Sequence, residues 1–355
     1  MRTGRADLPL HGGRAPRWLF ERMSSLGRAI ALAIVENEGP HAVLARLSDP
    51  YWFQAFGCVL GFDWHSSGVT TTVCGSLKDG LRGLQSDTGL VVAGGKGKTS
   101  RKTPAEIEAA CERASIDPAP LVRSSRLSAK VDSSAVQDGF DVYHHCFVFT
   151  TDGAWAVVQQ GMNEGTGLAR RYHWLDAPRF DRDPHASVAG EADGGVLNLV
   201  ASEGESNRAV STELSRENPA RITKELERMK TLTMPRHHEL RLTDIDPRRI
   251  ERVLVKSYET QPADYTALLA TPGVGAKGLR ALSLVAEVAY GARASVRDPA
   301  SFSFAHGGKD GTPFPVDRKT YDSTIEALKV TVADARIGRT DKKNALQRLA
   351  RVGST

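Results

Sequence analysis

Cysteine and long apolar runs are scarce in this chain, and both shortages exclude whole classes of protein. It has only 4 cysteines in 355 residues, and no two of them form a Cys-x-x-Cys pair. Such spacing does not fit a disulfide-stabilised secreted scaffold or a zinc ribbon. The apolar stretch at residues 30–35 is too short to cross a bilayer, and residues 1–16 contain no apolar core of a secretory signal. We therefore expect reduced thiols, no membrane partner and a cytoplasmic, nucleoid-associated protein.

Aromatic residues make up only 6% of the chain, but the composition as a whole is that of a packed protein. It is 40% hydrophobic and 25% charged, and its length predicts two or three domains. Lysine and arginine number 47 against 42 aspartates and glutamates, a formal net charge of +5. This modest basic excess favours a polyanionic partner such as DNA.

The first hundred residues change from a helical to a mixed pattern. Apolar residues recur every three or four positions through residues 17–60, which predicts helices. Residues 61–102 are rich in Gly, Ser and Thr and contain β-branched or apolar runs at 69–73 and 90–92, so we expect mainly strands and loops there. An acidic helix is predicted over residues 104–113.

A β-hairpin is the clearest strand signal. Residues 143–150 and 154–160 alternate in polarity and are joined by an Asp-Gly turn. Neighbouring residues of a strand point to opposite faces, so one histidine and one glutamine, such as His145 and Gln159, are expected to share a polar face across the pair. A buried structural histidine is the alternative for this position.

The composition divides the chain into two domains. Residues 176–220 are rich in Asp, Glu, Ser, Gly and Pro and are predicted to be a loop-rich linker. Residues 1–175 then form a mixed α/β domain that contains the hairpin, and residues 221–355 form an all-α domain. The predicted fold class is α+β.

The most specific motif lies in the helical domain. From Tyr265 the chain reads Y-T-A-L-L-A-T-P-G-V-G-A-K-G-L-R-A-L-S-L-V-A-E-V-A, two short amphipathic helices joined by a Pro-Gly-Val-Gly turn. Gly273 and Gly275 permit a tight turn whose amides point outward at the start of the second helix, where a phosphate binds. Val274 is expected to pin the turn between the helices.

This segment resembles the helix-hairpin-helix motif of DNA repair and recombination proteins. The resemblance implies DNA-backbone binding without sequence specificity, with Lys277 and Arg280 adding salt-dependent attraction. A helical hairpin that uses glycine only for packing, or that holds a protein partner, is the alternative.

Helix-hairpin-helix DNA glycosylases suggest a second function for the same region. By that resemblance Lys277 falls at the position of the nucleophilic lysine, and Asp317 in F-P-V-D-R is the candidate catalytic acid. Their separation of 317 − 277 = 40 residues and the insert F-A-H-G-G-K-D-G depart from the family pattern. The alternative makes Lys277 a phosphate contact and Asp317 a helix cap or ion-pair partner.

The first domain carries the candidate catalytic residues. In G-F-D-W-H-S-S-G, Asp63 and His65 lie two residues apart and share a face of an extended segment, where they can hold Mg²⁺ or Mn²⁺ or orient a water. Lys78 or Lys96 would stabilise the developing charge on phosphorus, and His145 with Gln159 would complete the polar floor. A hydrogen-bonded structural turn is the alternative for Asp63 and His65.

Other basic residues are candidates for DNA contacts. Lys96, Lys98 and Arg101 lie in a Gly- and Ser-rich stretch suited to a phosphate backbone, and Arg170 and Arg171 neighbour aromatic residues in A-R-R-Y-H-W. A solvated basic loop and a packed edge are the respective alternatives. V-A-G-G-K-G-K-T-S lacks the first glycine of a P-loop, so no nucleotide cofactor is expected.

Four further segments of the chain together resemble a single protein family. G-R-A-D-L-P-L-H-G-G, G-F-D-W-H-S-S-G, V-V-Q-Q-G-M-N and F-A-H-G-G-K-D-G-T-P-F-P-V-D-R resemble a bacterial and archaeal family known only as a domain of unknown function. The resemblance covers almost the entire chain and implies no catalytic residues.

These observations together predict a DNA repair or processing enzyme. The first hypothesis is a metal-assisted nuclease, the second a base-excision glycosylase or AP lyase, and the third a non-catalytic DNA-binding adaptor.

Overall fold

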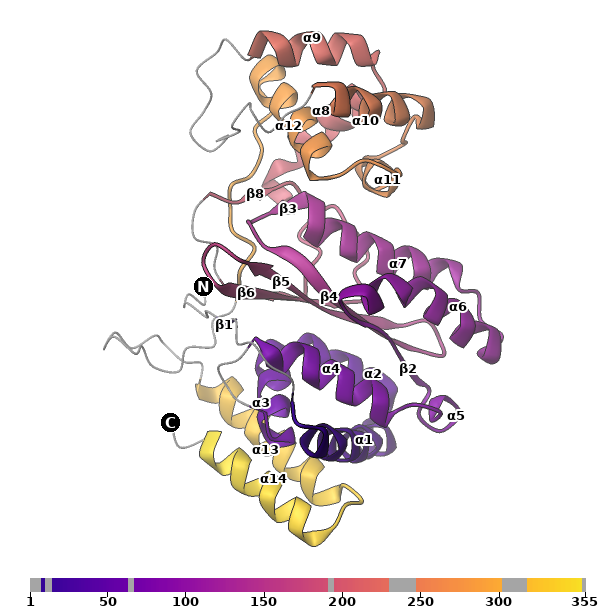
Figure 1. Ribbon diagram of the computed structural model, residues 1–355, viewed down its shortest axis with the longest axis vertical. Coiled ribbons are helices and arrows are strands. Elements are labelled where there is room, and N and C mark those ends of the chain that lie inside the picture. Colours follow the sequence, from indigo (N-terminus) through magenta and orange to yellow (C-terminus); the bar gives the residue numbers. More distant parts are fainter. Residues whose placement is uncertain are drawn as a thin grey trace, which may run out of the picture.

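The computed structural model describes most of the chain. The described residues are 8–9, 15–62, 67–190, 195–229, 247–301 and 318–352. Figure 1 shows an elongated molecule in which a central sheet separates two groups of helices. The protein is therefore mixed α and β, as predicted.

The central sheet is antiparallel, and its strands run in the order β1-β6-β5-β4-β2, with β7 beside β6. Its members are β1 (Leu8–Pro9), β2 (Leu90–Lys96), β4 (Asp141–Thr150), β5 (Trp155–Asn163), β6 (Leu168–Leu175) and β7 (Ser187–Ala189). The predicted hairpin is confirmed, because β4 and β5 pair directly across a turn.

Both faces of the sheet are buried, and alternate residues of β4 enter two different cores. Phe147 and Phe149 belong to the core on one face, whereas Cys146 and Val148 belong to the core on the other. The alternation follows from the two-residue repeat of a strand. Polar residues in the middle of β4 and β5, such as His144, His145 and Gln159, are therefore buried whichever face they occupy.

The face on the N-terminal side is covered by helices from both ends of the chain (Figure 1). Helices α13 and α14 pack against α3, and α13 also contacts α1. The helices of this layer are α1 (Arg17–Glu38), α2 (Pro40–Ser48), α3 (Pro50–Leu60), α4 (Gly68–Gly80), the short α5 (Gln85–Thr88), α13 (Arg318–Asp334) and α14 (Arg339–Val352).

Two α-helices cover the opposite face, α6 (Thr103–Ala114) and α7 (Ala119–Lys130). The short helix η1 (Gly97–Lys102) precedes them, and η2 (Val131–Ala135) and the strand β3 (Val136–Gln137) follow them. Beyond them lies a second helical layer, reached through β8 (Leu197–Asn198) and η3 (Ser202–Gly204). Its helices are α8 (Glu205–Ser215), α9 (Pro219–Met229), α10 (Pro247–Thr260), α11 (Tyr265–Ala270) and α12 (Ala276–Tyr290).

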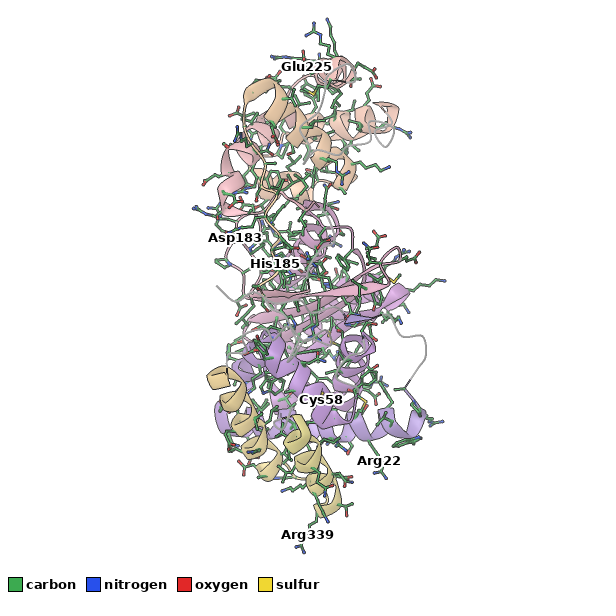
Figure 2. The ribbon with its side chains drawn as sticks, turned by 90° about the vertical axis from the view of Figure 1, so that its left-hand side faces the viewer. Arg22, Cys58, Asp183, His185, Glu225 and Arg339 are labelled. Carbon is green, nitrogen blue, oxygen red and sulfur yellow. The ribbon has the colours of Figure 1, made fainter. Side chains whose placement is uncertain are left out.

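Figure 2 shows the same stacking from the side. His185 lies at the level of the sheet, Cys58 among the helices of one layer, and Glu225 at the far end of the other. None of the helices in the described part of the chain is long and apolar enough to cross a membrane.

The arrangement differs from the predicted domains in two places. The segment predicted as a linker contains β7, β8 and α8, and α8 packs against α12 as part of the second helical layer. The last two helices leave that layer and join the N-terminal one. A polar composition had concealed these elements, because they bury only a few apolar residues each.

Residues 69–73, part of a region expected to hold mainly strands and loops, form the first turns of α4. Val69, Val73 and Leu77 are buried at four-residue spacing, and Val69 and Val73 lie against Gly57 of α3. Tertiary packing on this stripe outweighs the β preference of Val and Thr.

An ion pair closes the edge of the sheet at β2. Lys78 on α4 lies 2.6 Å from Glu106 on α6 and donates to the Gly94 carbonyl at 2.8 Å, while Glu106 accepts from the Gly94 amide at 2.7 Å. Gly94 has φ +89°, and a Cβ there would collide with the His145 carbonyl and lie 2.7 Å from Thr103 Oγ1. The edge strand is therefore held by helices from both layers.

We predict that Gly94→Ala destabilises the fold much more than Gly97→Ala. Both glycines have positive φ, but a Cβ at Gly97 would meet nothing within 4 Å. Gly97→Ala should cost about 1 kcal/mol through backbone strain alone, and Gly94→Ala about 3 kcal/mol or more because of the added collision. Urea unfolding measures both; equal losses would contradict the packing described here.

Candidate functional site

Three of the predicted catalytic residues, Asp63, His65 and Asp317, lie outside the described residues. Among the residues that the structure does describe, no group of three or more His, Cys, Asp or Glu side chains is placed to hold a metal ion.

The turn between α11 and α12 has the geometry of a tight helical hairpin. Gly273 adopts φ +88°, and Gly275 is the extended N-cap residue of α12. Val274 between them is fully buried and packs in the core. Asp264 caps α11 by accepting from the Ala267 amide at 2.7 Å. Val274 thus anchors the turn in the core, and Gly273 is exposed at its tip.

The first amides of α12 point away from the helix at this turn. The Leu279 amide makes the first helical bond, to the Gly275 carbonyl at 3.0 Å. The amides of Ala276, Lys277 and Gly278 precede it and have no acceptor within the helix. Lys277 is exposed beside them. Orphan amides, the positive end of the helix dipole and a lysine thus converge on one surface.

Arg280, predicted to contact DNA, is half-buried and hydrogen-bonded to β3. Its Nε donates to Gln137 Oε1 at 2.5 Å, and Gln137 Nε2 donates to the Ala276 carbonyl at 2.9 Å. Gln137 belongs to β3, so these bonds fasten the hairpin to the segment beside the sheet. We conclude that Arg280 positions the hairpin.

Basic side chains continue from the hairpin along α7. This helix packs against α11 and contains no acidic residue. Arg123 and Arg126 are exposed on its outer side, and Lys130 is half-buried at its end. Lys96 at the end of β2 and Lys98 and Arg101 in η1 are exposed, so their DNA contacts stay a prediction. Lys96 also lies 5.6 Å from the ring centroid of Tyr143.

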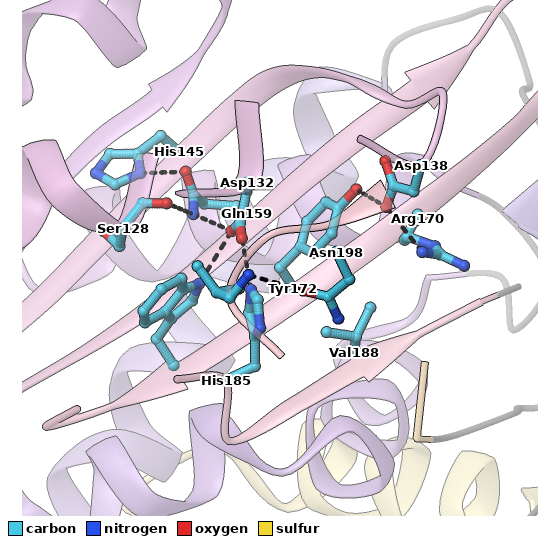
Figure 3. A network of polar contacts seen from close by, with 12 residues as sticks. Ser128, Asp132, Asp138, His145, Gln159, Arg170, Tyr172, His185, Val188 and Asn198 are labelled. Carbon is cyan, nitrogen blue, oxygen red and sulfur yellow. Dashed lines mark hydrogen bonds and ion pairs between the residues drawn. The ribbon is translucent and has the colours of Figure 1, made fainter. Parts of the chain in front are cut away.

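His145 and Gln159 meet as predicted, but inside the protein. They are directly opposite in the β4–β5 register, and His145 Nδ1 lies 2.9 Å from Gln159 Oε1. His145 Nε2 lies 2.9 Å from Ser125 Oγ on α7. Gln159 Nε2 donates to the Ser128 carbonyl at 3.2 Å and to Asp132 at 2.5 Å (Figure 3). The pair is buried, so its hydrogen bonds serve to join the sheet to α7.

Asp132 is the centre of this network, and the sequence did not single it out. Its carboxylate also lies 2.5 Å from His185 Nε2 and accepts from Trp174 Nε1 at 3.0 Å. Burial raises the pKa of Asp132, while the neighbouring His185 and the hydrogen bonds lower it. Its hydrogen-bond partners Gln159, Trp174 and His185 lie 27, 42 and 53 residues away in the sequence, so no local motif reveals them.

Arg170 is buried and ion-paired, which corrects the prediction of an exposed phosphate clamp. Its guanidinium is fully buried and lies 2.7 Å from Asp138 and 2.6 Å from Asp298. Tyr172 donates to the same Asp138 oxygen at 2.8 Å (Figure 3). The alternation of β6 carries Arg170 and Tyr172 into one core, so neither reaches DNA in this conformation.

The predicted DNA contact of Arg171 is wrong for the same reason, because this residue is buried on the opposite face of the sheet. It is fully buried, donates to Gln54 Oε1 at 2.9 Å and stacks 4.6 Å from the Phe53 ring centroid. Burial lowers the pKa of Arg171 to about 9. Lys78, predicted to stabilise a phosphorane, is instead the ion-pair partner of Glu106.

Two neighbouring histidines are kept neutral by the sheet. Burial lowers the pKa of His144 to about 3, with His145 and Lys96 adding to the effect, and burial lowers the pKa of His145 to about 4. They point to opposite faces, and each is surrounded by a different core.

Comparison with known proteins identifies one family. The model of a family described as "Protein of unknown function (DUF763)" matches residues 4–316, which is most of the chain. No curated protein and no solved structure matches the chain.

We predict that acid destabilises the wild type more than a His144→Phe variant. Folded His144, with a pKa of about 3, stays neutral, whereas the unfolded chain takes up a proton below the ordinary value of 6.5. The unfolded state therefore binds more protons, and stability falls as the pH falls from 6.5. One such histidine contributes about 1.4 kcal/mol per pH unit.

The difference in unfolding free energy between wild type and variant should consequently change by about 2 kcal/mol between pH 6.5 and about pH 5. Urea unfolding across that window measures it. A constant difference would show that His144 is not held neutral by its surroundings.

Proposed function

The chain belongs to the DUF763 family of proteins of unknown function, and we propose that it binds DNA through the phosphate backbone at the hairpin between α11 and α12. The observation that carries the proposal is the turn itself. Gly273 at positive φ and buried Val274 hold the amides of α12 outward beside exposed Lys277. Outward amides at a helix start favour a phosphate group whatever the base sequence.

The charge around the turn supports a nucleic acid over a neutral protein partner. Helix α7, which contacts α11, adds Arg123, Arg126 and Lys130 with no acidic residue among them. DNA bound at the hairpin would therefore have the basic side chains of α7 close by. The resemblance of the segment to helix-hairpin-helix proteins agrees with this proposal.

We predict that Lys277→Ala weakens binding to duplex DNA of any sequence by several-fold. Loss of one phosphate contact should also reduce the slope of log affinity against log salt by about 1. Lys329→Ala is the matched control, because this exposed lysine lies on α13 in the other helical layer. Fluorescence anisotropy over a salt series measures both variants. Equal affinity and slope for Lys277→Ala and wild type would refute hairpin binding.

For the chemistry, we propose metal-assisted cleavage of the bound DNA, with Asp63 and His65 as the candidate residues. Ser67, two residues after His65, is a described residue, and Gln160 Nε2 donates to its carbonyl at 2.9 Å. Base excision with Lys277 and Asp317, and binding without catalysis, are the competing functions.

A substrate panel should separate the three. We predict Mg²⁺- or Mn²⁺-dependent cleavage of at least one of single-stranded, duplex, flap, abasic and damaged-base DNA, lost in the double variant Asp63→Ala plus His65→Ala. A borohydride-trapped adduct or metal-independent base loss would assign the chemistry to Lys277 instead. DNA binding without any turnover would leave the adaptor function.

A further inference from the structure

Four polar residues form a straight row across the sheet, on the face covered by α1 to α4. Lys96 is opposite His144, His144 opposite Gln160, and Gln160 opposite Arg171. They come from β2, β4, β5 and β6 in turn. We call this set the cross-strand row. Directly opposed residues lie side by side on one face, so the row is contiguous.

A β-bulge adds Tyr143 to the exposed end of the row. The β4–β5 register shifts between Val142 and His144, which leaves Tyr143 as the extra residue beside His144. Gln160 Nε2 lies 2.5 Å from the Tyr143 hydroxyl, and the Lys96 ammonium lies 5.6 Å from the Tyr143 ring centroid. Tyr143 is only half-buried and Lys96 is exposed, so solvent reaches this end.

The N-terminus of α4 meets the same row. Gln160 Nε2 donates to the carbonyl of the N-cap residue Ser67, and Arg171 lies 3.4 Å from Thr70 Oγ1 in the first turn. This helix is 13 residues long, so its first turn carries outward amides and the positive end of a full dipole. Positive potential from the helix therefore adds to that of Lys96 and Arg171.

Unpaired polar atoms in the row are the second, independent observation. His144 is 1% exposed, and within the part of the chain that the structure describes neither of its ring nitrogens has a hydrogen-bond partner. Gln160 Oε1 is likewise buried and unpaired there. A neutral imidazole offers one donor and one acceptor, and the amide oxygen is an acceptor. Leaving such groups unpaired is costly, so a ligand that satisfies them gains affinity.

We propose that the cross-strand row and the first turn of α4 form a binding site for a phosphate ester that also carries a hydroxyl, such as a nucleotide or the end of a nucleic-acid strand. The phosphate oxygens accept from the α4 amides and from the His144 N–H, in the field of Lys96 and Arg171. The hydroxyl donates to Gln160 Oε1. The charged members of the row, Lys96 and Arg171, are both basic, which favours an anionic ligand.

This site is separate from the hairpin, so it does not depend on the DNA-binding proposal. The hairpin lies in the second helical layer, on the other side of the sheet from α4 (Figure 1). Loss of one site should leave the other intact. The two proposals can therefore fail independently.

Isothermal titration calorimetry of the full chain tests the site with three probes. Thymidine 5′-monophosphate should bind, thymidine should not, and inorganic phosphate should show whether the ester is required.

His144→Phe keeps the ring shape but removes both nitrogens, and should weaken nucleotide binding at least 10-fold without lowering Tm. Lys96→Ala should weaken binding several-fold, and Lys98→Ala, outside the row, should not. Lys277→Ala should bind the nucleotide as wild type does.

Two outcomes would overturn the proposal. One is a wild type that binds neither phosphate probe at millimolar concentration. The other is unchanged nucleotide binding in both His144→Phe and Lys96→Ala. If His144→Phe does not fold, the exposed Lys96→Ala variant, compared with Lys98→Ala, decides the question alone. If inorganic phosphate binds as tightly as the nucleotide, the site recognises only the phosphate group, and the proposed hydroxyl contact is refuted.

Discussion

The Asp132 carboxylate is the contact on which the arrangement of the sheet and the second helical layer depends. It is buried at the start of η2 and binds donors from β5, β6 and the loop that follows β6, namely Gln159, Trp174 and His185. The same segment runs on into β3, whose Gln137 holds the hairpin. One buried carboxyl group, hydrogen-bonded by three partners, thus links the centre of the sheet to the surface proposed to bind DNA.

Polar doublets on three adjacent strands give the sheet its two chemically different faces. His144-His145, Gln159-Gln160 and Arg170-Arg171 each place one member on either side. His145, Gln159 and Arg170 join hydrogen-bonded networks below α7. The other three members face α1 to α4, where His144 and Gln160 retain unpaired atoms in the described part of the chain. We infer that the first set stabilises the fold and that a ligand of the second set would engage the unpaired atoms of His144 and Gln160.

Local patterns predicted the elements well, and long-range contacts account for what they missed. The hairpin, the acidic helix and the helices after residue 220 follow from periodicity and turn residues. Residues 69–73 were misjudged because packing in the N-terminal core decided their conformation, and Arg170 and Arg171 because both faces of β6 are covered. Asp132 and His185 were missed because only the folded chain brings them together. Asp63, His65 and Asp317 remain predictions.

Hydrogen exchange of the protein with and without a duplex tests the DNA-binding proposal most directly. The amides at the start of α12 have no acceptor in the helix, so they exchange quickly unless a ligand covers them. We expect DNA to slow exchange at Gly275 to Gly278 and along the exposed side of α7, and to leave α13 and α14 unchanged. Protection confined to other parts of the chain, with none at this turn, would contradict the proposal.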